Sequence, residues 1–179
     1  METKVPFYNI VNIFLPGLVF IGSCILLFLD ETKVFVDSVT ALGSTGLEVL
    51  ITVSCFAIAY EVGYFIFRLG AVGIEPILKK LFGWTDYKEF IAAGKTGEKA
   101  YKKLDMLSQE YGYSRTQITL FIALAVLTGV KTHWWIMGVC IFFVILFVLT
   151  ARGHMIKIQT AVVQYLAVNN IENKVKNYG

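Results

Sequence analysis

Four long runs of hydrophobic residues alternate with polar segments along the chain. Two of them, residues 10–29 and 132–151, contain no charged side chain over twenty positions. Only two glutamates interrupt a third run, residues 47–67. A fourth, residues 116–130, is shorter, and its flanking arginine and lysine can extend it by reaching the interface. Because a helix of about twenty residues is about 30 Å long, the thickness of a hydrocarbon core, the pattern predicts an all-α protein with four transmembrane helices.

The composition supports this prediction. The chain has 179 residues, of which 56% are hydrophobic and 16% are charged, whereas soluble domains contain about 25% charged residues. The runs also lack the alternation of polar and apolar positions that the strands of a membrane barrel require. Helices are the other structure that satisfies every backbone group inside a bilayer. We therefore expect a helical protein that crosses the membrane several times.

Basic residues are distributed unevenly between the two sides of the predicted spans. Fourteen lysines and arginines lie on one side, in the N-terminal lead, the loop 68–115 and the tail from Arg152, and two lie on the other side. Cytoplasmic loops of membrane proteins carry the excess of basic residues. The distribution predicts a four-span domain over residues 1–151 with a cytoplasmic loop at 68–115, a cytoplasmic C-terminal helix over 152–179, and both termini inside.

The loop and the tail contain amphipathic helical patterns. Apolar residues recur at helical spacing in 74–82, 98–111 and 155–166. The first of these predicted helices can lie in the membrane interface or pack beneath the bundle. The apolar stripes of loop and tail can pack together or join neighbouring subunits, and no proline prevents the fourth span from continuing as one helix past Arg152. The candidate partner-binding or membrane-binding residues are Lys79, Lys80, Trp84, Lys99, Lys102 and Lys103.

The sequence contains no recognisable catalytic or cofactor-binding motif. The Gly-Lys-Thr at Gly94 resembles part of a phosphate-binding loop, but the glycine that the motif needs at position 89 is a glutamate. His133 and His154 fall at opposite ends of the last predicted span and cannot share a metal ion. We expect the cysteines, which all lie inside spans, to be buried reduced thiols. The prediction is a non-enzymatic protein without metal, cofactor or direct nucleic-acid binding.

Glu61 stands inside the second predicted span, about 10 Å from its basic end at Arg68. A charge at the centre of a transmembrane helix costs about 2.5–3.5 kcal/mol, so an isolated carboxylate needs a polar partner. Asparagines of the first span and polar residues at the start of the third enter the membrane from the same side. We predict a polar cluster that either joins the helices or forms an ion or proton site; its members are Asn9, Asn12, Glu61, Arg68, Arg115 and Gln117.

Small residues and a proline indicate where helices approach closely. Pro16 and Gly17 predict a kink in the first span, because proline lacks an N–H and crowds the carbonyl four residues earlier. Cys55, Ala59 and Gly63 are spaced by four and form a ridge that another backbone can approach, within the chain or between subunits. Glu61 lies about 200° around the helix from Ala59 and so faces away from the ridge. Four spans bury little surface alone, which favours a homo-oligomer.

Three short segments carry a resemblance to a known family. These are "FLPG" in the first span, "AYEVGYFIFRLG" in the second, and "YGYSRTQITL" where the basic loop returns to the membrane. The layout resembles the membrane subunit of Kiwa-type anti-phage defence systems. The resemblance implies a sensor or effector in a bacterial inner membrane that works with a cytosolic protein partner and contacts lipid. The alternative from the residues is an ion channel or small transporter with Glu61 in its pathway.

Overall fold

The computed structural model describes residues 10–40 and 45–178, and these are almost entirely helical and contain no strand. In chain order the elements are the π-helical turn η1 (Ile10–Phe14), α2 (Leu15–Leu27), α3 (Leu29–Thr40), α4 (Thr45–Leu69), the π-helical turn η2 (Gly70–Ile74), α5 (Glu75–Phe82), α6 (Tyr87–Gly94), α7 (Glu98–Val130) and α8 (Trp134–Tyr178).

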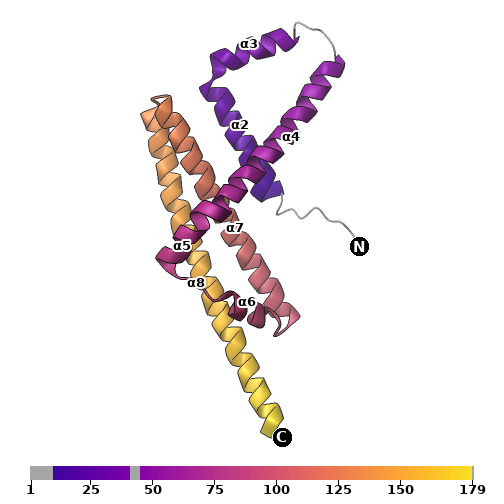
Figure 1. The fold of residues 1–179 in the computed structure, drawn as a ribbon, viewed down its shortest axis with the longest axis vertical. Helices are drawn as coiled ribbons and strands as arrows, with labels where there is room; N and C mark the ends of the chain where they lie inside the picture. Colours follow the sequence, from indigo (N-terminus) through magenta and orange to yellow (C-terminus); the bar gives the residue numbers. More distant parts are fainter. Residues whose placement is uncertain (1–9, 41–44, 179) are drawn as a thin grey trace.

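The elements form two helical pairs (Figure 1). Helices α2 and α4 cross one another and are linked through α3, while α7 and α8 run side by side as a long hairpin. The turn of the hairpin lies beside the end of α2, where the ammonium of Lys131 is 3.8 Å from the ring centre of Phe28. Both connections, α3 and the hairpin turn, therefore lie at the same end of the molecule.

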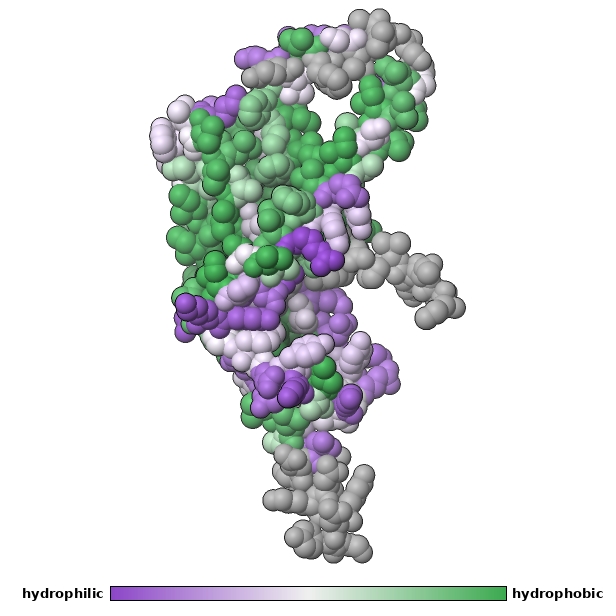
Figure 2. Space-filling view, viewed as in Figure 1, coloured by the Kyte–Doolittle hydropathy of each residue, from purple (hydrophilic) through white to green (hydrophobic). Residues whose placement is uncertain are grey.

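Four helical stretches are long and apolar enough to cross a membrane. They are Ile10–Leu27, Gly46–Phe82, Glu98–Val130 and Trp134–Asn169. Figure 2 shows hydrophobic residues over the half of the molecule that holds α2, α4 and the turn end of the hairpin, and hydrophilic residues gathered over the other half, around α5 and α6. The predicted all-α fold with four helices of membrane-spanning length is confirmed.

The two π-helical turns have the same physical cause. Each is followed by a helix with a proline in its first turn, Pro16 in α2 and Pro76 in α5. A proline cannot donate a backbone hydrogen bond and crowds the carbonyl four residues earlier. A π-helical turn uses bonds to the fifth preceding residue instead, as when the N–H of Glu75 donates to the carbonyl of Gly70. A π-helical turn therefore directly precedes Pro16, where the sequence predicts a kink.

The main hydrophobic core lies mostly in the hydrophilic half and reaches the predicted spans at Ile118 and Ala151. Its buried side chains come from α5, α6, α7 and α8: Leu78, Ala93, Leu104, Leu107, Tyr111, Ile118, Ala151, Met155, Ile158 and Val162. The apolar stripes of the loop and the tail therefore pack together within one chain. Helix α5 contributes Leu78 to this core and leaves Ile77 and Leu81 exposed. Helix α8 continues without a break from Trp134 to Tyr178, so the fourth span and the tail form one helix.

Candidate functional site

The structure divides the predicted polar cluster between separate places. Glu61 and Arg68 are exposed on α4, where Arg68 Nε donates to Tyr64 Oη over 2.8 Å. Beside Glu61 lies a hollow of about 400 Å³ with otherwise apolar walls from α2, α4 and α7. Asn12, Arg115 and Gln117 are instead buried. Asn9 lies outside the described residues.

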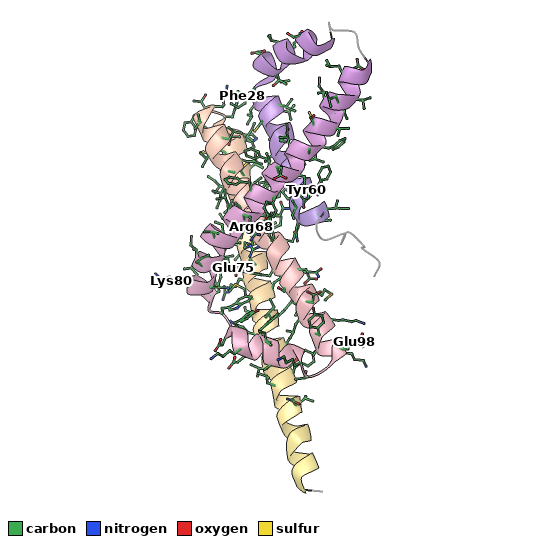
Figure 3. All side chains as sticks on the ribbon, turned by 45° about the vertical axis from the view of Figure 1, so that its right-hand side comes forward. Phe28, Tyr60, Arg68, Glu75, Lys80 and Glu98 are labelled. Atoms are coloured by element: carbon green, nitrogen blue, oxygen red, sulfur yellow. The ribbon has the colours of Figure 1, made fainter. Side chains whose placement is uncertain are left out.

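Arg115 forms an ion pair with Glu75, the first residue of α5. The two side chains are 10% and 22% exposed. Glu75 also binds Lys79, whose Nζ lies 2.6 Å from Oε1 of the carboxylate. The guanidinium of Arg115 stacks 5.1 Å from the ring centre of Phe67. We call Glu75, Lys79 and Arg115 the Glu75 junction. It joins the start of α5 to the middle of α7, and Glu75 is labelled in Figure 3.

The small-residue ridge packs within the chain, against the first span. A Cβ atom on Gly63 would overlap the backbone carbonyl of Ile13, and one on Gly17 would overlap that of Ala59. The helix backbones of η1–α2 and α4 are therefore in direct contact at these positions. Cys55, the third predicted member of the ridge, is exposed and does not take part. Glu61 faces away from this contact, as predicted from its angle to Ala59.

The candidate surface residues of the loop divide into two groups. Lys80, Lys99, Lys102 and Lys103 are exposed, and Lys102 pairs with Glu98 across one helical turn at 2.6 Å. Lys79 belongs to the Glu75 junction, and its ammonium stacks 4.8 Å from the ring centre of Trp84. Trp84 packs in turn on Tyr111 at 5.3 Å between ring centres. The four exposed lysines are the part of this set that is accessible to a partner.

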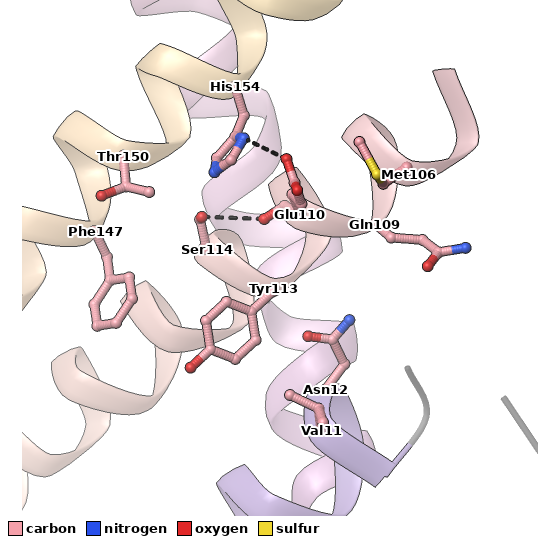
Figure 4. A pocket seen from close by; sticks show the side chains of 10 residues that line it. All are labelled: Val11, Asn12, Met106, Gln109, Glu110, Tyr113, Ser114, Phe147, Thr150 and His154. Carbon is pink, nitrogen blue, oxygen red and sulfur yellow. Dashed lines mark hydrogen bonds and ion pairs between the residues drawn. The ribbon is translucent and has the colours of Figure 1, made fainter. Parts of the chain in front are cut away.

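A pocket of about 620 Å³ lies between η1, α7 and α8 (Figure 4). Its lining residues are Val11 and Asn12 from η1, Met106, Gln109, Glu110, Tyr113 and Ser114 from α7, and Phe147, Thr150 and His154 from α8. His154 Nδ1 lies 3.2 Å from Glu110 Oε2 at one end of the pocket. Sequence reasoning identified Asn12 but not the pocket, because its walls come from three segments far apart in the chain.

The side-chain amide of Asn12 is a buried polar group in the wall of this pocket. Asn12 is 1% exposed, and neither its amide nitrogen nor its amide oxygen has a hydrogen-bond partner among the described residues. A buried polar group without a partner costs about 1–3 kcal/mol. An unpaired amide in a pocket wall therefore indicates a missing hydrogen-bond partner at this place.

Within the described part of the chain, no group of three or more histidine, cysteine or acidic side chains is arranged to hold a metal ion. Comparison with protein-family models, curated proteins and solved structures finds no match to this chain. The fold itself defines the class: an all-helical protein with four helices that are long and apolar enough to span a membrane.

Proposed function

We propose that the chain is a non-enzymatic, oligomeric membrane protein of the inner membrane of bacteria that acts as a sensor, effector or scaffold. In this proposal the loop and tail face the cytoplasm and signal to a soluble protein, and the response belongs to anti-phage defence. The observation that carries the proposal is the continuity of α7 and α8. Each runs as one helix from the hydrophobic half into the hydrophilic half, where both belong to the same core.

This continuity supports coupling between the membrane-spanning part and the hydrophilic half of the molecule. Neither α7 nor α8 is interrupted along its length. A change in their relative position inside the bilayer therefore also moves the ends of the two helices that lie in the hydrophilic half. The start of α7, in the hydrophilic half, carries the exposed lysines Lys99, Lys102 and Lys103. A protein partner with an acidic surface can bind these lysines, and its binding would change when they move.

The partner prediction is tested with the triple substitution of Lys99, Lys102 and Lys103 by glutamate. The membrane protein is purified from cells that carry it, and the amount of a soluble protein that co-purifies is measured. We expect the glutamate variant to reduce that amount by at least roughly tenfold, because its carboxylates would repel an acidic partner surface. The triple arginine variant keeps the charge and should retain binding. Equal recovery with all three forms would contradict docking at this patch. Phage plating on cells with and without the gene tests the defence role separately.

The position of Glu61 supports an oligomer. In a single chain this carboxylate is exposed on a helix of membrane-spanning length beside apolar residues such as Phe65. Placing a charge toward lipid costs about 2.5–3.5 kcal/mol on insertion scales. A second copy that covers this face and supplies a hydrogen-bond donor removes part of that cost.

We expect Glu61→Leu to shift the purified protein from oligomer toward monomer, because the donor on the neighbouring copy then stays unpaired. Mass photometry in detergent at matched concentration measures the ratio. Glu48→Leu removes an exposed glutamate near the other end of the same helix and serves as the control. If the Glu61→Leu and Glu48→Leu variants have the same ratio of oligomer to monomer, Glu61 does not lie in the contact between subunits.

An ion channel is the second candidate, and the hollow beside Glu61 is the observation that favours it. In an oligomer this hollow would lie between copies, with the carboxylate in its wall. A channel that is open at rest would depolarise cells expressing the protein, and Glu61→Gln would abolish the effect at matched membrane levels. Under our first proposal neither form changes the resting membrane potential.

A further inference from the structure

The pocket between η1, α7 and α8 continues along the hairpin. A second hollow of about 230 Å³ shares Tyr113 and Phe147 with it and extends between α2 and the hairpin. Apart from Tyr113 and Gln117 its walls are apolar, and they include Val19, Leu120 and Phe143. We call the two hollows together the Asn12 groove. It begins at Glu110 and His154, outside the predicted spans 116–130 and 132–151, and ends inside the spans.

This arrangement matches an amphiphile oriented as in a bilayer. The end outside the spans carries a carboxylate and an imidazole, and the far end carries Val19, Leu120 and Phe143. The unpaired amide of Asn12, near the start of the first predicted span, lines the same pocket as the carboxylate and the imidazole. Pockets of about 300–1,000 Å³ with mostly apolar walls and a few polar groups are typical of small-molecule sites. A molecule that is already in the membrane can enter such a groove laterally from the bilayer.

The charged residues that line the groove indicate which lipid headgroup it would bind. Among the described residues that line the groove there is no lysine or arginine, and the one acidic residue, Glu110, is 43% exposed and lies beside His154. A carboxylate favours a cationic amine and disfavours a purely anionic headgroup, which usually requires arginine or lysine. The amide nitrogen of Asn12 offers two N–H donors, which the oxygens of a phosphate ester or a glycerol ester can accept.

We propose that the Asn12 groove binds a phospholipid with an amine headgroup, of the phosphatidylethanolamine class. The ammonium pairs with the carboxylate of Glu110, the ester oxygens accept from the amide N–H groups of Asn12, and one acyl chain follows the wall formed by Phe147 and Leu120. This inference goes beyond the proposed signalling function and does not depend on it, since lipid binding is measured without a partner or a response.

Native mass spectrometry of the full chain, reconstituted in equal amounts of phosphatidylethanolamine and phosphatidylglycerol, tests the proposal. We expect the wild type to retain phosphatidylethanolamine over phosphatidylglycerol after weakly held lipids are removed. Glu110→Gln should lower that preference by roughly tenfold, because a hydrogen bond to a charged group is lost. Asn12→Leu should lower retention of both lipids. Glu98→Gln removes an exposed charge from the same helix outside the groove and should leave both quantities unchanged.

Folding of each variant is checked by its elution volume and its unfolding midpoint in detergent, and Glu110→Gln is informative even if Asn12→Leu fails to fold. Preferential retention of phosphatidylglycerol would overturn the headgroup assignment. A wild-type chain that retains no lipid would mean that another part of the protein or a second copy closes the groove, and would overturn the proposal. A preference that Glu110→Gln leaves intact would do the same.

Discussion

Gly63→Ala is expected to destabilise the protein by about 3 kcal/mol, the upper part of the range for overpacking a closely packed contact. The added methyl group would overlap the backbone carbonyl of Ile13, which belongs to a helix and cannot turn aside as a flexible side chain can. Relief requires η1–α2 and α4 to separate along their whole contact. The measurement is the free energy of unfolding in a denaturing detergent titration.

Gly22→Ala is the matched control, because Gly22 lies in α2, the helix that packs against α4, and a Cβ there meets no atom within 4 Å. Since alanine favours a helix over glycine by up to about 1 kcal/mol, this variant should be as stable as wild type or slightly more stable. Gly17→Ala should behave like Gly63→Ala, since its methyl group would overlap the carbonyl of Ala59. If Gly63→Ala and Gly22→Ala unfold alike, the two backbones are not in contact.

Arg115→Met is expected to destabilise the protein by about 3–5 kcal/mol, the range measured when one partner of a buried ion pair is removed. The carboxylate of Glu75, which is 22% exposed, would keep only Lys79 as its cationic partner. We expect α5 to lose its attachment to α7 and the segment between α5 and α6, residues 83–86, to be cleaved faster by protease. Unfolding titrations and limited proteolysis measure the two effects.

Two comparisons isolate the ion pair from other effects of the substitution. The double variant Glu75→Met with Arg115→Met removes both charges and should recover much of the lost stability, as replacing buried pairs by apolar residues often does. Glu98→Gln breaks the exposed pair with Lys102 and should change stability by less than about 1 kcal/mol. A single Arg115→Met variant as stable as Glu98→Gln would show that the Glu75 junction does not hold α5 in place.

The existence of the helices followed from local pattern, because hydrophobic run length and helical periodicity are properties of neighbouring residues. The close-packing ridge was also recognisable, since Ala59 and Gly63 share a helix face at a spacing of four. The angle between Ala59 and Glu61 was correct for the same reason. The helix that each face meets was not readable, and Glu61 points outward in the single chain whereas a polar interior was predicted for it.

The sequence by itself determined four membrane-length helices, amphipathic loop and tail segments, and a glycine face on α4. Tertiary structure decided the partners: Arg115 with Glu75 rather than with the Glu61 face, Gly63 with Ile13, and the unpaired amide of Asn12 beside α7 and α8. The physical reason is distance along the chain. Helix periodicity relates residues three or four positions apart, whereas Arg115 and Glu75 are 40 positions apart and meet only because packing brings α5 onto α7.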